Sequence, residues 1–169
     1  MKPEDILGHA PKVLTQEQRE FYFKTGYLLL ENFIGQDWLE RLWGVTDRFI
    51  EKSRTQTKSG GVFDLEPDHS ADNPRLRRIS QPVVIDPIYE EFGLRGPIVD
   101  LAEDLVGPNV KYHHSKLNMK WADGGEVVKW HQDIQFWPHT NYSPLTIGLY
   151  MDDVEDVMGP MGVIPGSPK

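Results

Sequence analysis

An α+β fold, mainly β, is predicted because the pattern of the chain changes once, beyond its middle. Before residue 106, apolar residues recur at helical spacing between recognisable start and stop residues. After Gly107-Pro108, apolar and polar residues alternate, as they do in half-buried strands. With 169 residues, the chain is long enough for one domain with its own core. We therefore expect a single domain over residues 1–169, with helices mainly in 15–106 and a β-rich part in 108–169.

The first elements follow from start and stop residues and from apolar spacing. Thr15 followed by Gln18 is typical of a capping box, and Gly26 is a natural stop, so a short helix is predicted between them. The compact apolar run YLLLENF, 27–33, is interpreted as a buried strand. An amphipathic helix over about 36–52 is predicted by four apolar residues at helical spacing: Trp38, Leu42, Val45 and Phe49.

The middle of the chain combines a long loop with helices that begin at proline. Residues 53–74 are rich in Ser, Thr, Gly, Asp and Pro, which predicts a loop or lid, and LRRISQPVV after it contains a short strand candidate. Asp86-Pro87 and Gly96-Pro97 each place proline at a first helical position, and Gly107 ends the second of these helices.

The back part consists of strand candidates. Residues 109–121 alternate, with Leu117 on one face and Lys116 on the other, which predicts a long strand with one polar face. Three further strand candidates follow the turn at Asp123-Gly124-Gly125: residues 126–133, 144–154 and 161–166.

The composition limits the partners that the chain can have. A net charge of −8 and a pI near 5.2 argue against nucleic acid and anionic membranes, since both require a basic surface. No window has the apolar length of a membrane span or a signal peptide, so we expect a cytoplasmic protein. The chain has no cysteine, so any metal must be held by His, Asp or Glu. The sequence gives no indication of the oligomeric state.

A candidate metal site lies in the stretch WHQDIQFWP, 130–138. In a strand, His131 and Asp133 would point to the same side, and an imidazole beside a carboxylate suits Fe(II), Mn(II) or Zn(II). The two-residue pattern is generic, however, and a strand with a solvated polar face explains it equally well. A zinc hydrolase would also need a general base near Asp133, and none is evident.

The wider context resembles the phytanoyl-CoA dioxygenase family of iron(II)- and 2-oxoglutarate-dependent oxygenases. Its members typically show W-H-x-D-x-x-x-W-P, then L-D-D-V, then N-G-x-L-x-x-x-P-G-S-H-K, and the chain has WHQDIQFWP, MDDV at 151–154 and GPMGVIPGSPK at 159–169 in that order. The opening FYFKTGYLLLENFIGQDWLERL is also similar to the family's first helix, strand and helix. The resemblance implies a double-stranded β-helix, a cupin-like jelly roll, behind N-terminal helices.

The resemblance also implies roles for single residues. His131 and Asp133 match the first two iron ligands of a two-histidine, one-carboxylate triad, and the carboxylate favours hydroxylation over halogenation. Lys116 and Arg78 match positions that contact 2-oxoglutarate, although both are equally well explained as solvated charges. Phe136 and Trp137 could line the cavity of a small-molecule substrate or simply pack at the barrel mouth. The implied reaction consumes dioxygen, converts 2-oxoglutarate to succinate and hydroxylates a substrate C–H bond.

The sequence departs from the family near its end. No residue matches the distal histidine ligand or the arginine that pairs with 2-oxoglutarate, and Pro168 stands where the family has the histidine of PGSHK. Of the remaining histidines, His114 is the best third-ligand candidate, from a neighbouring strand. We expect the front portion of a longer jelly roll, with an open sheet edge at 162–165 and no activity from residues 1–169 alone. The alternative is a non-catalytic family member that acts as a binding domain.

Overall fold

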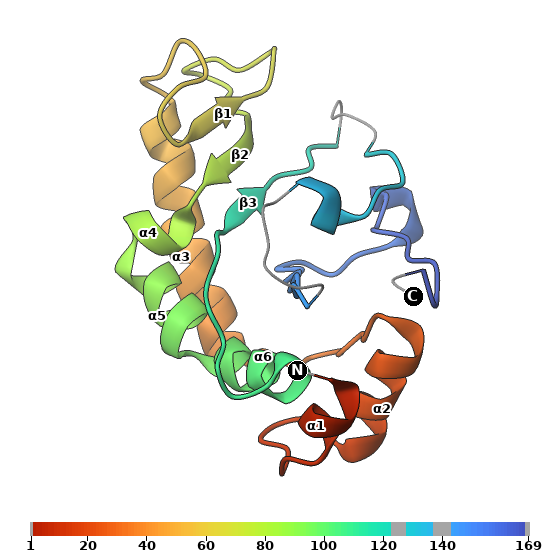
Figure 1. Cartoon of the computed structure of the whole chain (residues 1–169). Helices are drawn as coiled ribbons and strands as arrows, with labels where there is room; N and C mark the ends of the chain where they lie inside the picture. The colour runs from red at the N-terminus through yellow and green to blue at the C-terminus, as the bar shows by residue number, and fades with distance from the viewer. Residues whose placement is uncertain (1, 123–127, 137–142, 168–169) are drawn as a thin grey trace.

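The fold consists of a helical layer beside a small antiparallel sheet, followed by two long irregular segments (Figure 1). The computed structural model describes residues 2–122, 128–136 and 143–167. The helices are α1 (Pro3–Leu7), α2 (Gln16–Thr25), α3 (Gln36–Ser53), α4 (Pro82–Ile85), α5 (Pro87–Arg95) and α6 (Pro97–Val106). The strands are β1 (Phe63–Leu65), β2 (Leu76–Ser80) and β3 (Lys116–Asn118), and short 3-10 turns occupy Asp133–Phe136 and Asp156–Met158. The predicted α+β class is confirmed, but the described residues are mainly helical and not mainly β, and they do not form the expected double-stranded β-helix.

The predicted helices form where their caps indicated. The Thr15 hydroxyl accepts from the backbone N–H of Gln18 at 3.2 Å, and the Gln18 side chain accepts from the N–H of Thr15 at 2.8 Å. Gly26 ends α2 in the left-handed conformation, with φ at 84°. The Asp86 carboxylate caps α5 by accepting from the N–H of Ile88 at 2.9 Å. Capping residues located the ends of α2, and the proline at the first helical position located the start of α5.

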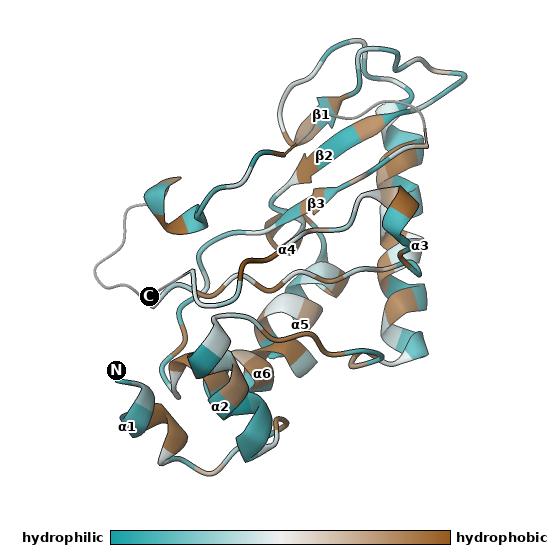
Figure 2. Ribbon diagram, turned by 90° about the vertical axis from the view of Figure 1, so that its right-hand side faces the viewer, coloured by the Kyte–Doolittle hydropathy of each residue, from teal (hydrophilic) through white to brown (hydrophobic). Residues whose placement is uncertain are grey.

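The sheet has the order β1-β2-β3 and contains a register shift (Figure 2). Asp64 pairs with Arg78, but the next residue of β1, Leu65, pairs with Leu76, so Arg77 is an extra residue in β2. In a regular strand, Leu76 and Ile79 would point to opposite faces. The extra residue between them lets both side chains become fully buried in one core.

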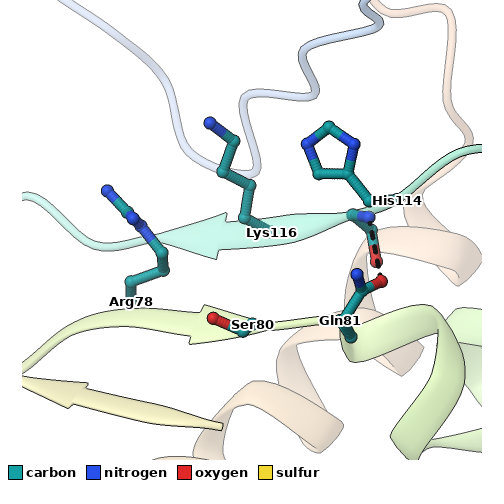
Figure 3. Close-up of a pocket in the computed structure, with 6 residues that line it drawn as sticks. Arg78, Ser80, Gln81, His114 and Lys116 are labelled. Atoms are coloured by element: carbon teal, nitrogen blue, oxygen red, sulfur yellow. Dashed lines mark hydrogen bonds between the residues drawn. The ribbon is translucent and has the colours of Figure 1, made fainter. Parts of the chain in front are cut away.

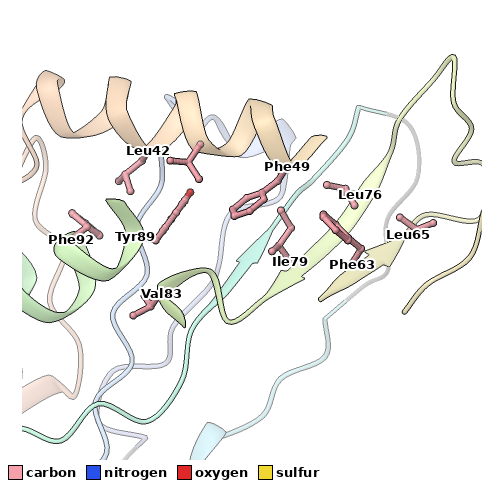
Figure 4. Packing of buried hydrophobic residues seen from close by; sticks show 10 residues of the cluster. Leu42, Phe49, Phe63, Leu65, Leu76, Ile79, Val83, Tyr89 and Phe92 are labelled. Carbon is pink, nitrogen blue, oxygen red and sulfur yellow. The ribbon is translucent and has the colours of Figure 1, made fainter. Parts of the chain in front are cut away.

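The main core lies between α3 and the inner face of the sheet (Figure 4). Phe49 of α3 meets Phe63 of β1 edge to face, with ring centroids 6.5 Å apart. The buried members of this cluster are Leu42, Val45, Phe49, Phe63, Leu65, Leu76, Ile79, Val83, Tyr89 and Phe92. Because this core covers one face only, the outer face of the sheet remains available for polar side chains.

The predicted strand at 27–33 is wrong. Its backbone forms no sheet ladder, and Leu28, Leu30 and Phe33 instead pack partly buried against Leu101 and Leu105 of α6. The run is apolar because it covers a helix, and none of the described strands pairs with it. A short apolar run does not distinguish these two environments.

The β-rich back part is also much less regular than predicted. The long strand expected at 109–121 is reduced to β3, and the described residues of 126–133, 144–154 and 161–166 contain no strand. Single hydrogen bonds attach these segments, such as Trp43 Nε1 donating to the Met151 carbonyl at 3.1 Å. The sheet edge expected at 162–165 is therefore not formed by the described residues. A strand requires a partner ladder, which periodicity alone does not supply.

Large apolar side chains are unusually exposed in these same segments. Val128, Trp130, Met161 and Val157 expose 74%, 71%, 71% and 90% of their surfaces. None of the helices in the described ranges is long and apolar enough to cross a bilayer.

A buried carboxylate fixes the N-terminal segment to α6. Asp104 accepts hydrogen bonds from the backbone N–H groups of Lys12, Val13 and Leu14 at 2.8, 2.9 and 2.9 Å. Burial raises the pKa of Asp104, but these hydrogen bonds and the charge of Arg19 outweigh it, so that the net pKa is lowered. A carboxylate whose pKa is lower in the folded state stabilises the fold above its unfolded-state pKa.

We predict that Asp104→Asn lowers the free energy of unfolding by about 2 kcal/mol at pH 7, because its amide turns N–H groups toward backbone donors. The difference in free energy of unfolding between the variant and the wild type should shrink as the pH falls below about 4. Below this pH the Asp104 carboxyl is protonated in the unfolded chain, and at still lower pH it is protonated in the folded protein as well, so its charge no longer stabilises the fold. Urea unfolding between pH 3 and 7 measures this difference, with the exposed Asp47→Asn as the matched control. A destabilisation that is equal at every pH would contradict the charge-based explanation.

Candidate functional site

A pocket of about 240 Å³ opens on the outer, polar face of the sheet (Figure 3). Its lining comes from the end of β2 and from the segment that enters β3: Arg78, Ser80, Gln81, His114, Ser115 and Lys116. Two of these side chains are cationic and none is a carboxylate, so the lining favours an anion.

Strand pairing brings these residues together from distant parts of the sequence. Arg78 pairs with Asn118 and Ser80 pairs with Lys116, so these four residues share one face of the sheet. The Arg78 Nε donates to the Asn118 side-chain oxygen at 3.0 Å, which orients the guanidinium. Figure 3 shows Arg78, Lys116 and His114 pointing to the same side of the strands. The structure thus brings Lys116 and Arg78 together, as one anion-binding pair would require.

His114 connects the pocket electrostatically to Asp133. Burial is the largest cause that lowers the pKa of His114, and the charges of His113 and Lys116 lower it further. The Asp133 carboxylate acts in the opposite direction and raises that pKa without cancelling the others. His114 is therefore a neutral pocket residue at pH 7 that lies within electrostatic range of Asp133.

His131 and Asp133 form a close pair of donor atoms. His131 Nε2 lies 3.1 Å from Asp133 Oδ1, and both side chains are about one-third exposed. Two donor atoms that bind one metal ion at right angles, each at about 2.1 Å, lie about 3.0 Å apart. The observed separation therefore fits two ligands of one metal ion.

The surroundings of the pair determine where its protons lie. His131 Nδ1 lies 2.7 Å from the Lys129 carbonyl, which can only accept, so Nδ1 carries a hydrogen. A neutral imidazole then presents the lone pair of Nε2 to a carboxylate oxygen that is also an acceptor. A proton or a metal cation must lie between the two atoms to make this contact favourable. Thr146 Oγ1 donates to the other oxygen of Asp133 at 3.1 Å, which orients the carboxylate.

The backbone around this pair differs from the prediction. His131 precedes a 3-10 turn that begins at Asp133, so the two residues do not occupy a strand as expected. The turn also places the Phe136 ring edge to face with the His131 ring, with centroids 5.5 Å apart, while Phe136 remains 63% exposed. Trp137 lies outside the described residues. Among the described residues, no third His, Asp or Glu joins the pair to complete a metal-binding group, and this includes His114.

Ser80, Gln81 and Ser115 line the pocket but were not predicted from the sequence. All three are common residue types, and the pairing of β2 with β3 joins segments about 40 residues apart. The only local indication was the Gln81-Pro82 pair directly after a strand candidate, which marks the end of β2.

Comparison with known proteins identifies related sequences over most of the chain. The family model described as phytanoyl-CoA dioxygenase (PhyH) matches residues 22–169. A probable alpha-ketoglutarate-dependent hypophosphite dioxygenase from Stutzerimonas stutzeri is 29% identical over 93% of this chain and 54% of its own length. An L-proline trans-4-hydroxylase from Streptomyces griseoviridis is 43% identical over 41% of this chain and 28% of its own length.

Solved structures include one with a similar fold. The crystal structure of EctD from S. alaskensis with bound Fe matches 73% of this chain and 42% of its own chain, with a TM-score of 0.61 and 22% identity. The chain spans about half the length of the full-length relatives that it matches. Since the family model covers all but the first 21 residues, the chain belongs to the phytanoyl-CoA dioxygenase family.

Proposed function

We propose that this chain provides the first two metal ligands and the cosubstrate pocket of an iron(II)- and 2-oxoglutarate-dependent dioxygenase that hydroxylates a small molecule. The observation that carries the proposal is the separation of 3.1 Å between His131 Nε2 and Asp133 Oδ1, which fits two ligands of one metal ion. The names of the relatives support the reaction class, since they are dioxygenases and a hydroxylase.

In this proposal, His131 and Asp133 hold the iron, and the Lys129 carbonyl and Thr146 keep their donor atoms in place. Bound iron(II) supplies the redox chemistry that couples decarboxylation of 2-oxoglutarate to succinate with transfer of one oxygen atom of dioxygen into a substrate C–H bond. A third protein ligand would come from outside the described residues, and further strands would complete a double-stranded β-helix around the site.

Lys116 and Arg78 bind a carboxylate of 2-oxoglutarate in the pocket, whose volume of about 240 Å³ can hold a small dicarboxylate. Ser80 and the neutral His114 supply additional polar contacts at the same face. Phe136 forms part of the wall for the substrate, and the relatives' names, hypophosphite, L-proline and ectoine, point to a small molecule.

A non-catalytic binding domain is the second candidate. The pocket favours this alternative, because Arg78 and Lys116 could hold a dicarboxylate without any metal. The two functions differ in one measurable way. In the oxygenase, the affinity for 2-oxoglutarate depends on a metal ion held by His131 and Asp133, whereas in a binding domain it does not.

We predict that His131→Ala and Asp133→Ala each weaken Mn(II) binding by at least about tenfold without unfolding the chain, since both side chains are partly exposed. Anaerobic titration of the chain with Mn(II), followed by electron paramagnetic resonance, measures the affinity. Thr146→Val should weaken binding less, because it removes only an orienting hydrogen bond.

The matched controls for this titration are His9→Ala and Asp153→Ala, which remove the same residue types elsewhere. Equal Mn(II) affinity in His131→Ala, Asp133→Ala and the two controls would reject the assigned ligands.

We also predict that Lys116→Met and Arg78→Ala each raise the dissociation constant for 2-oxoglutarate about tenfold, while Mn(II) affinity changes less than about twofold. Each variant loses one charged hydrogen-bond donor to a carboxylate of 2-oxoglutarate. Because both side chains are exposed to solvent, the loss of affinity lies at the low end of the range usual for such donors. Calorimetric titration at low and high salt measures the effect, with Lys111→Met and Arg95→Ala as controls. Unchanged affinity in the pocket variants would mean that these charges only face solvent.

A further inference from the structure

Gln81 has an unusual backbone conformation at the edge of the pocket. With φ at 58° and ψ at 44°, it lies in the left-handed region, which glycine or asparagine adopts more easily than glutamine. Asn32 is the other non-glycine residue with positive φ in the described chain, and it belongs to a turn before α3. A strained residue beside a pocket suggests that its side chain has a function there.

The backbone and side chain of Gln81 together hold Ser115. The Gln81 N–H donates to the Ser115 carbonyl at 2.9 Å, and the Gln81 side-chain oxygen accepts from the Ser115 N–H at 3.4 Å (Figure 3). The same oxygen lies 3.3 Å from the Tyr112 hydroxyl, which in turn lies 2.9 Å from Ser115 Oγ. The N–H group and the carbonyl of Ser115 are therefore both hydrogen-bonded to Gln81.

Ser115 stands between two other residues of this segment that line the pocket. His114 precedes it and Lys116 follows it, and regular pairing with β2 begins only at Lys116, opposite Ser80. The contacts of Gln81 continue the pairing beyond the strand, into a segment that has no ladder of its own. The contacts of Gln81 thus hold the backbone from which the His114 and Lys116 side chains project.

We propose that Gln81 is a positioning residue for the cosubstrate pocket, fixing residues 112–116 so that Lys116 and His114 face a bound dicarboxylate. This inference rests on the proposed function of the pocket. The left-handed backbone of Gln81 turns the chain from β2 into α4 while its side chain reaches back to Ser115, and glycine could make the turn without supplying the contact.

Two substitutions separate positioning from a structural role. Gln81→Met keeps the length of the side chain and the strained backbone but removes the acceptor, whereas Gln81→Gly removes the acceptor and relieves the strain. If Gln81 positions the pocket, both variants raise the dissociation constant for 2-oxoglutarate about tenfold, although the glycine variant unfolds at higher denaturant concentration than the methionine variant. If its role is merely structural, the glycine variant binds like the wild type. Asn32→Gly is the matched control for relief of strain away from the pocket.

The imidazole resonances of His114 give a second readout that does not require cosubstrate. With six histidines, the ring signals of the full chain can be assigned by single substitution, and both Gln81 variants should shift or broaden the signal of His114. If the wild-type chain does not bind 2-oxoglutarate, the proposed function of the pocket fails, and the His114 signal alone then tests the role of Gln81. Two results would overturn the inference. One is wild-type affinity for 2-oxoglutarate in the Gln81→Gly variant, and the other is a His114 signal that is unchanged in both Gln81 variants.

Discussion

The extra residue in β2 is the constraint on which the rest of the structure depends. Leu76 and Ile79 are separated by three positions and would diverge in a regular strand, yet both are fully buried against α3. The register shift at Arg77 resolves this conflict and leaves Arg78 and Ser80 on the opposite face. Without it, either a large apolar side chain or the cationic pocket would be lost. The same irregularity therefore serves the core and the candidate site.

The candidate site combines a rigid half with a less regular half. Arg78, Ser80 and Lys116 lie on paired strands that are supported from behind by the main core. His131 and Asp133 lie instead in a segment with a single 3-10 turn, where local hydrogen bonds from Thr146 and to the Lys129 carbonyl orient them. Sites on regular elements hold their geometry more accurately than sites on loops. Binding of the anion should thus be better preorganised than binding of the metal.

The back part leaves large apolar side chains exposed in segments that form no strand among the described residues. Val128 and Trp130 alternate with polar residues, Val157 lies in the 3-10 turn Asp156–Met158 and Met161 follows that turn, and these segments hold isolated hydrogen bonds in place of ladders. A strand-like sequence without a partner strand cannot satisfy its backbone groups in a sheet, so it settles into extended, solvated chain.

The sequence by itself determined the features that depend on neighbouring residues. The capping residue Thr15 and the proline at position 87 located helix starts, and the alternation around Leu117 located a polar strand face. The spacing of His131 and Asp133 brought two donor atoms together even though the strand expected there is a 3-10 turn. Each of these results from hydrogen bonds or side-chain directions within a few residues.

Only the tertiary structure decided which distant segments pair. It joined β2 to β3 to make the pocket, inserted Arg77 as an extra residue, placed 27–33 against α6 in place of a sheet, and put Gln81 in contact with Ser115. Apolar runs and apolar–polar alternation indicate that a segment has a buried face, but they do not indicate which other segment covers that face. That choice depends on packing among parts of the chain that are far apart in sequence, and so it becomes visible only in the folded molecule.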